Sequence, residues 1–223
     1  MDRLKPLFPE IPADRRGLLA RMVALHREWN ARVNLVSRKD IDHLEWHHYA
    51  PCLAAVKLLR LAEGATLIDV GTGGGFPGLV LAALYPQARF TLADSVGKKI
   101  AVVADIAKKL GLRNVEVKNV RVETLARQYD FVTGRAVTSL PGFVQLVRKL
   151  VRPGGGKHTP PNGILYWKGG SLADEEAALG LAPSRVLSLE ETLGDPYFHE
   201  KYIVHYPQPD LARARPPEPP PAT

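Results

Sequence analysis

Glycines that follow a strand-like run mark the most informative segment of the chain. Residues 67 to 78 read Leu-Ile-Asp-Val-Gly-Thr-Gly-Gly-Gly-Phe-Pro-Gly, so an apolar run contains Asp69 and a second apolar run follows Pro77. Glycine has no Cβ, and its backbone can therefore approach a ligand closely. A helix that begins after such a loop turns free N–H groups toward the same place, where they favour an anionic group. The segment predicts a site for the nucleoside end of a cofactor.

Two cofactor classes fit this loop. The spacing from Gly73 to Gly78 satisfies the G-x-G-x-x-G template of dinucleotide binders, and Asp94 follows at the interval of a ribose-binding acid. That match is weak, because a run of glycines satisfies many templates and Pro77 removes an N–H that a pyrophosphate could use. The other template has an acid at the strand end, Asp69, with glycines at every second position afterwards. It resembles the first motif of class I S-adenosylmethionine-dependent methyltransferases.

Alternating strands and helices must position this loop. From Ala65 onward, short apolar runs alternate with helical patterns, which is typical of parallel βαβ units with helices on both faces. We therefore expect an α/β fold with a doubly wound, mostly parallel, seven-stranded sheet. The predicted strands are residues 66–70, 89–93, 114–118, 129–133, 164–168, 186–189 and 201–206, and the predicted helices are 77–85, 97–110 and 139–151.

The regions on either side of this pattern differ in composition. Residues 1–62 form a predicted N-terminal helical cap, with one amphipathic helix and a second helical stretch at 40–61 that Pro51 interrupts. The apolar stripe of the first helix consists of Leu18, Met22, Leu25, Trp29 and Val33. The methyltransferase-like domain spans residues 63–207. Residues 208–223 are proline-rich and predicted to be a disordered tail, and residues 153–163 form a turn-rich, mobile loop.

Composition and charge indicate the cellular compartment of the protein and the kind of partner it binds. The chain has 223 residues and a formal net charge of +7, which favours a polyanionic partner such as nucleic acid, although charge also serves solubility alone. The single cysteine, Cys52, excludes an internal disulfide and fits a reducing compartment. No apolar segment has the length of a signal peptide core or of a membrane span. We expect a soluble, cytoplasmic protein without a membrane partner.

Further segments extend the resemblance to one family. They are Trp29-Asn30 with Val33-Asn34-Leu35, the Gly-Phe-Pro-Gly end of the loop, Asp94-Ser95 with Lys98-Lys99, and Gly134-Arg135-Ala136. In this order they resemble the bacterial 16S ribosomal RNA guanine-N7 methyltransferase family (the RsmG or GidB family), over residues 18 to 170. The chain departs from the family pattern at Leu35-Val36, where many members have Leu-Thr. It departs again at 48–53, where the usual aspartate is absent.

The resemblance implies S-adenosylmethionine as the cofactor and a set of residues that bind it. These are Gly71, Gly73, Gly75, Phe76, Asp94, Val122, Glu123 and Arg135. The residues themselves support two of these roles. A carboxylate such as Asp94 can accept from both ribose hydroxyls, and Arg135 follows the fourth strand, where open α/β sheets bind ligands. The alternatives are that Asp94 is a helix N-cap and that Arg135 is a surface cation.

The implied reaction needs few chemical groups from the protein. Guanine N7 has a free lone pair and no proton to lose, so we expect no catalytic acid or base, and no metal. The implied partner is 16S ribosomal RNA or the small ribosomal subunit, and we expect the protein to be a monomer. Candidate RNA contacts are Arg15, Arg16, Arg27, Arg32, Arg38, Lys39, Lys98, Lys99 and Arg121, with Trp46, His47 and His48 as stacking residues.

Three other functions stay open at this point. A small-molecule methyltransferase would have an enclosed apolar pocket above the strand ends, in place of an open basic face. A nicotinamide-dependent oxidoreductase would use the dinucleotide template of the glycine loop. A non-catalytic RNA-binding module would carry a degenerate loop, which the intact glycine series and Asp94 argue against.

Overall fold

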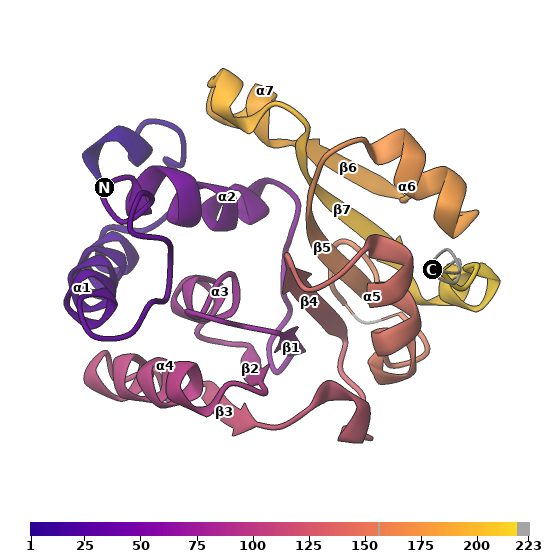
Figure 1. Ribbon diagram of the computed structural model, residues 1–223, viewed down its shortest axis with the longest axis horizontal. Helices are drawn as coiled ribbons and strands as arrows, with labels where there is room; N and C mark the ends of the chain where they lie inside the picture. The colour runs from indigo at the N-terminus through magenta and orange to yellow at the C-terminus, as the bar shows by residue number, and fades with distance from the viewer. Residues whose placement is uncertain (156, 218–223) are drawn as a thin grey trace, which may run out of the picture.

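The protein is built on one central sheet (Figure 1), and the computed structural model describes residues 1–155 and 157–217. The sheet has the strand order β3-β2-β1-β4-β5-β7-β6, and β7 is the strand that runs antiparallel to its neighbours. This arrangement confirms the predicted α/β, doubly wound and mostly parallel sheet of seven strands. The strands are β1 (Thr66–Val70), β2 (Arg89–Asp94), β3 (Val115–Asn119), β4 (Phe131–Arg135), β5 (Gly163–Gly169), β6 (Arg185–Ser188) and β7 (Lys201–Pro207).

Helices cover both faces of the sheet, as Figure 1 shows. One apolar cluster joins the sheet to α1, α3 and α4, and a second joins it to α5 and α6. The apolar faces of these helices are removed from water on the sheet, which is the main source of their stability. The helices are α1 (Ala13–Asn30), α2 (Ala50–Leu53), α3 (Gly78–Leu84), α4 (Gly97–Lys109), α5 (Leu140–Val147), α6 (Leu172–Leu179) and α7 (Leu189–Leu193).

The strand order creates a crevice at the middle of the sheet. β1 pairs with β2 on one side and with β4 on the other, and all three strands are parallel. Chain segments that leave the carboxyl ends of β1 and β4 therefore diverge to opposite faces. In open α/β sheets, ligands bind in the crevice at such a switch point.

The N-terminal cap packs on α3 and differs in detail from the prediction. Helical turns run without a break from Glu45 to Lys57 as a π-helical turn, α2 and a 3-10 turn, and Pro51 is the second residue of α2, directly after the π-helical turn. The predicted interruption at Pro51 is therefore wrong. In α1 the buried stripe is Leu19, Met22, Val23 and His26, and the predicted Leu18, Leu25 and Trp29 lie half-buried beside it.

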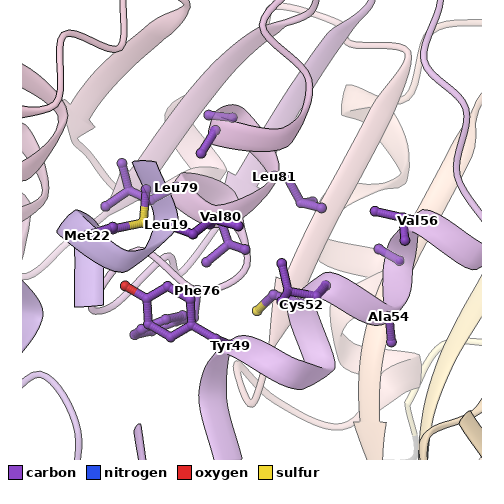
Figure 2. Close-up of a cluster of buried hydrophobic side chains, with 14 of the residues drawn as sticks. Leu19, Met22, Tyr49, Cys52, Ala54, Val56, Phe76, Leu79, Val80 and Leu81 are labelled. Atoms are coloured by element: carbon purple, nitrogen blue, oxygen red, sulfur yellow. The ribbon is translucent and has the colours of Figure 1, made fainter. Parts of the chain in front are cut away.

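Side chains from the cap and from the segment that follows β1 meet in one core. Figure 2 shows Leu19 and Met22 of α1 next to the rings of Tyr49 and Phe76 and to Leu79 and Val80 of α3. Cys52 belongs to the same core: its thiol donates to the carbonyl of His48 at 3.1 Å, and burial raises its pKa to about 12. This thiol stays protonated and packs as a small apolar group. The predicted boundary at residue 62 stays a prediction, because this core extends across it.

Part of the C-terminal segment is folded. Residues Gln208–Arg213 form a 3-10 helix, Leu211 is 2% exposed, and the N–H of Arg215 donates to the carbonyl of Leu179 at 2.8 Å. The predicted disorder is wrong for residues 208–215, because Leu211 and Ala214 are buried among α5 and α6. Residues 218–223 of the predicted tail lie outside the described residues.

The loop at 153–163 also has fixed points, which the prediction of mobility did not foresee. Thr159 exchanges two backbone hydrogen bonds with Arg60, and the side chain of His158 is 7% exposed. Residue 156 of this loop lies outside the described residues.

Candidate functional site

A buried carboxylate at the end of β1 shapes the glycine loop. Asp69 is fully buried, and its Oδ2 accepts from the hydroxyl of Thr72 at 2.6 Å and from the N–H of Gly78 at 2.9 Å. Its Oδ1 accepts from the hydroxyl of Thr133 on β4 at 3.1 Å. Burial raises the pKa of Asp69 to about 6, and the three hydrogen bonds act in the opposite direction. The carboxylate therefore ties the two ends of the loop together.

Two glycines of the loop are required by geometry. Gly71 has φ +67°, and a Cβ there would lie 2.9 Å from the side chain of Val137. Gly75 has φ +94°, and a Cβ there would lie 2.4 Å from Leu79 at the start of α3. Gly71 lines the site described below. Gly75 packs against Leu79 of α3 and lines none of the cavities described below, and its contact with a cofactor stays a prediction.

Two cavities adjoin the loop at the carboxyl ends of the strands. The loop cavity has a volume of about 380 Å³ and the edge cavity, beside β2 and β3, about 190 Å³. Gly71, Asp94 and Val137 line both, so the two cavities are neighbours and Asp94 lies where they meet. The loop cavity is also lined by Leu35, Val36, His48, Thr72, Gly73, Gly74, Phe76, Lys99, Arg135 and Ala136, and the edge cavity by Val70, Ala93, Ser95, Val120, Arg121, Val122, Glu123 and Leu146.

Asp94 sits at the junction of these two cavities and holds the loop. Its Oδ2 accepts from the N–H of Gly73 and its Oδ1 from the N–H of Val96, each at 2.8 Å. Val96 is the N-cap of α4, so Asp94 supports the start of that helix without being the N-cap itself. Each carboxylate oxygen has a second lone pair. Asp94 can therefore hold the loop and accept from ligand hydroxyls at the same time.

Arg135, at the end of β4, reaches the other side of the loop cavity. Its Nη2 donates to Nδ1 of His48 at 3.0 Å, and its guanidinium carbon lies 5.2 Å from the ring centre of Phe76. Burial, with the nearby Arg135 cation, lowers the pKa of His48 to about 4. His48 is therefore neutral at pH 7 and serves Arg135 as an acceptor. This contact fixes the arginine in the cavity and excludes a purely surface role for it.

Two of the other predicted residues line the edge cavity. Val122 and Glu123 begin a 3-10 turn directly after β3, with Val122 half-buried and the Glu123 side chain exposed. The carbonyl of Glu123 accepts from Nζ of Lys149 at 2.8 Å, which ties the turn to the segment after α5. The structure thus brings seven of the eight predicted site residues to the lining of the two neighbouring cavities, and Gly75 is the exception.

A third cavity of about 380 Å³ adjoins the loop cavity and was not predicted. Arg135 and Ala136 line both, so this acceptor cavity opens next to the same arginine. Its walls combine aromatic and charged side chains: Tyr166, Trp167, Lys168, Glu175, Lys201 and Tyr202. Lys168 and Glu175 form an ion pair at 3.3 Å. The sequence signal for part of this wall was the Tyr166-Trp167-Lys168 end of β5, which was interpreted as a strand alone.

Aromatic residues that were predicted to stack on RNA contact other side chains of the protein. Trp46 is 9% exposed, has the Arg3 guanidinium 3.4 Å from its ring centre and donates through Nε1 to Asp195 at 2.8 Å. His47 stacks on Tyr197 with 3.7 Å between ring centres. Stacking on RNA is therefore wrong for Trp46, because both its ring and its N–H have protein partners.

Lys99 lines the loop cavity, and three other predicted cations are close to its lining residues in the chain: Lys98 precedes Lys99, and Arg38 and Lys39 follow Val36. Arg38, Lys39 and Lys98 are exposed and Lys99 is half-buried, and within residues 1–155 and 157–217 none of them has an ion-pair partner. By contrast, Arg15 and Arg32 pair with acidic neighbours on α1. The unpaired cations are the ones best placed to meet a polyanion at this cavity.

A cavity larger than these three lies at the other end of the sheet. Its volume is about 630 Å³, and its walls include Thr66, Arg89, Arg113 and Asn114, near the amino ends of β1, β2 and β3. No predicted site residue lines it. Across the described ranges, no helix has the length and apolar character to cross a membrane, and no group of three or more His, Cys, Asp or Glu side chains is arranged to hold a metal ion.

A sheet with this order, a glycine loop after β1 and a carboxylate at the end of β2 define a Rossmann-like methyltransferase fold. A crystal structure of an MtNAS mutant in complex with S-adenosylmethionine has this fold, with a TM-score of 0.54 at 14% identity over 86% of this chain and 76% of that one. The profile of the family described as rRNA small subunit methyltransferase G (GidB) matches residues 16–180. The chain belongs to this family.

Relatives of the same name match nearly the whole chain. "Ribosomal RNA small subunit methyltransferase G" of Christiangramia forsetii is 40% identical over 208 residues, which cover 93% of this chain and 97% of the relative. The protein of the same name from Flavobacterium psychrophilum is 38% identical over 207 residues, which cover 93% of this chain and 98% of the relative.

Proposed function

We propose that this protein transfers the methyl group of S-adenosylmethionine to N7 of a guanine in the 16S ribosomal RNA of the small subunit. The observation that carries the proposal is that the loop cavity and the acceptor cavity are neighbours, with Arg135 and Ala136 in the lining of both. One cavity has the groups that a nucleoside cofactor needs, and the other opens beside it. The names of the relatives support small-subunit RNA as the substrate, and the family resemblance supports guanine N7.

The residues that line the loop cavity and the edge cavity suit the chemical groups of S-adenosylmethionine. The adenine would lie in the edge cavity beside the backbone of Val122 and next to Glu123. Asp94, at the junction, would accept from the ribose hydroxyls. The methionine part would lie in the loop cavity near Phe76 and Arg135, whose cation attracts a carboxylate. The predicted contacts of Gly71 and Gly73 belong to the same cavity.

The reaction requires orientation more than proton transfer. The cofactor supplies a methyl group on a sulfonium sulfur, and the acceptor nitrogen supplies a lone pair, so one S–C bond breaks as one N–C bond forms. The positive charge moves from sulfur to the purine, and no proton leaves. The protein must hold the two partners in line and exclude water, which is the role we assign to the walls of the two cavities. The neutral His48 holds Arg135 in place. It is not needed as a base, because the guanine loses no proton in this reaction.

The RNA would be held by charge around the cavity mouth. The chain has a net charge of +7, and Arg38, Lys39, Lys98 and Lys99 have no ion-pair partner in the described part of the chain. Contacts of this kind are independent of sequence and weaken with salt. Such a protein would act in the cytoplasm, where small subunits are assembled.

The test is methyl transfer from radiolabelled S-adenosylmethionine to 16S RNA and to purified small subunits from cells that lack the protein. We expect label in one guanine, identified as N7-methylguanosine by mass spectrometry of the digested RNA, and none with the Asp94→Ala variant. Label at another atom would contradict the N7 assignment. Transfer only to small aromatic compounds would favour the alternative of a small-molecule methyltransferase, which the aromatic walls of the acceptor cavity also fit.

A further inference from the structure

Two buried residues of the N-terminal cap contact the glycine loop from behind. His26 of α1 is 1% exposed, its Nε2 lies 2.7 Å from the carbonyl oxygen of Gly74, and its Nδ1 lies 2.6 Å from the hydroxyl of Tyr49. The imidazole is stacked on Phe76 with 4.8 Å between ring centres, and the Tyr49 ring meets Phe76 edge-on at 5.3 Å. Figure 2 shows the rings of Tyr49 and Phe76 together in this core.

The direction of these hydrogen bonds follows from the groups involved. Burial lowers the pKa of His26 to about 4, so the imidazole carries one proton at pH 7. A carbonyl oxygen can only accept, and that proton therefore lies on Nε2, which donates to Gly74. Nδ1 is then the acceptor for the Tyr49 hydroxyl, while the carbonyl of Met22 lies farther away, at 3.1 Å. Tyr49, His26 and Gly74 form a directed chain, the cap relay.

The loop is held from two opposite sides at adjacent residues. Asp94 accepts from the N–H of Gly73, and His26 donates to the carbonyl of Gly74. The N–H of Gly74 has no acceptor among the described residues and adjoins the loop cavity, so it is available to a ligand.

This loop has unusual conformational freedom that the relay removes. Gly73 with φ +57° and Gly75 with φ +94° flank Gly74, and glycine loses more backbone freedom on ordering than any other residue. A ligand that had to order the loop itself would bind more weakly by the cost of that ordering.

We propose that His26 and Tyr49 are positioning residues that hold the glycine loop in the conformation that binds the cofactor. The inference rests on the proposed function, because it takes the loop cavity as the cofactor site. It also makes the cap a part of that site, although its residues lie far from the loop in the sequence. His26 and Tyr49 contact the loop and not the reacting atoms.

The chain offers two matched controls. His205 is fully buried, its Nδ1 accepts from the Ser184 hydroxyl at 2.8 Å, and its Nε2 donates to the carbonyl of Pro161 at 2.9 Å, at the amino ends of the strands. Tyr85 donates its buried hydroxyl to the carbonyl of Leu59 at 2.8 Å. His205→Leu and Tyr85→Phe therefore remove the same kinds of bonds as His26→Leu and Tyr49→Phe, without touching the loop.

The experiment is calorimetric titration of each variant with S-adenosylmethionine, with its melting temperature measured alongside. We expect the Kd to rise about tenfold in His26→Leu and about threefold in Tyr49→Phe, and to stay within about twofold in both controls. All four should melt at lower temperatures than the wild type. His26→Gln, which keeps an N–H donor near the position of Nε2, should recover most of the lost affinity.

Unchanged affinity in His26→Leu and Tyr49→Phe would overturn the proposal, and so would an equal loss of affinity in the two controls. If His26→Leu does not fold, Tyr49→Phe decides, because it loses a single hydroxyl: an unchanged Kd overturns the proposal. A wild-type protein that does not bind S-adenosylmethionine would instead contradict the proposed function. The two failures are thus distinguishable.

Discussion

At the carboxyl ends of the strands His26 accepts from a hydroxyl and donates to a backbone carbonyl, and at the amino ends His205 does the same. Each end also has an aspartate that accepts from backbone. Asp94 accepts from Gly73 and Val96, and Asp130, which is 6% exposed, accepts from the N–H and hydroxyl of Thr66 at 2.8 and 2.9 Å. The two ends use the same chemical groups in nearly the same way.

The ends differ in what these groups hold. His26 and Asp94 hold glycines of a loop that lines a cavity, and the loop keeps an N–H free. His205 holds Pro161, and Asp130 also accepts from Arg152 at 2.7 Å, so every one of these bonds joins segments of the protein to one another. A buried polar network is therefore not by itself a sign of a binding site. The backbone that it fixes, and the space beside that backbone, decide the role.

The largest expected effect comes from the amino ends. Asp130→Ala leaves the buried N–H and hydroxyl of Thr66 without an acceptor and the more exposed Arg152 without its partner, and two unsatisfied buried donors together cost on the order of 3 kcal/mol. We expect the free energy of unfolding in urea to fall by about that amount, with the Kd for S-adenosylmethionine within about twofold of wild type. A large loss of cofactor affinity in this variant would show that the two ends are not separate.

Asp94→Ala should lower the affinity for S-adenosylmethionine strongly and the stability of the fold only slightly. It removes the acceptor for Gly73 and Val96 and the proposed ribose contacts, all charge-assisted, so we expect the Kd for S-adenosylmethionine to rise about 100-fold. Because Asp94 is half-buried, the free energy of unfolding should fall by no more than about 1 kcal/mol. Calorimetry and urea unfolding measure the two quantities, and a variant that lost stability but kept its affinity would reverse the assignment.

The two histidines should contribute equally to the pH dependence of stability. Burial lowers the pKa of each to about 4 from 6.5, so the folded protein keeps both neutral while the unfolded chain protonates them below 6.5. Stability is therefore lost as pH falls from 6.5 toward 4. Each histidine should account for about 1 kcal/mol between about pH 7 and about pH 5.5.

Two further groups act in the same pH range. The pKa of His48 is also lowered to about 4, so His48 adds to the loss of stability as pH falls. The pKa of Asp69 is raised to about 6, so Asp69 reduces that loss. Urea unfolding at the two pH values checks the comparison: His26→Leu and His205→Leu should each reduce the acid loss by a similar amount. If His205→Leu leaves the loss unchanged, His205 does not stay neutral in the folded protein.

The smallest expected effect concerns RNA. Arg38, two residues after Val36 of the loop cavity, and Arg113, in the lining of the large cavity at the amino ends, are both exposed and have no ion-pair partner within the described ranges. We expect Arg38→Ala to weaken binding to 16S RNA by a few-fold and to reduce the slope of log affinity against log salt by about 0.7 to 0.9, and Arg113→Ala to change neither. Equal effects of the two variants would place the RNA on both ends of the protein.

The sheet and most of the site could be predicted because their signals are local. Short apolar runs mark the strands, the glycine series marks the loop, Asp94 directly follows a predicted strand, and Arg135 lies two positions after another. Two helices were missed although their starts carry a signal. Ser171 and Ser188 each accept from the N–H three residues later, at the start of α6 and of α7.

The other features depend on packing between distant segments. His26 and Gly74 are 48 positions apart, and a histidine in a charged helix gives no sign that it faces a loop. The acceptor cavity joins Lys168 of β5 to Glu175 of α6, a helix that was not predicted. Leu211 lies in a proline-rich stretch whose composition indicates disorder, and its burial depends on packing with residues of α5 and α6 that are distant in the sequence.

The central claim is that the carboxyl ends of the strands transfer a methyl group to guanine N7 in small-subunit RNA. The most direct test is the content of N7-methylguanosine, by mass spectrometry, in 16S RNA from cells that lack the gene and carry wild-type, Asp94→Ala or Asp130→Ala protein. We predict that the modification is lost in the deletion and with Asp94→Ala. Wild-type protein should restore it fully, and Asp130→Ala should restore it in proportion to its folded amount. A full complement of N7-methylguanosine in the deletion would contradict the account.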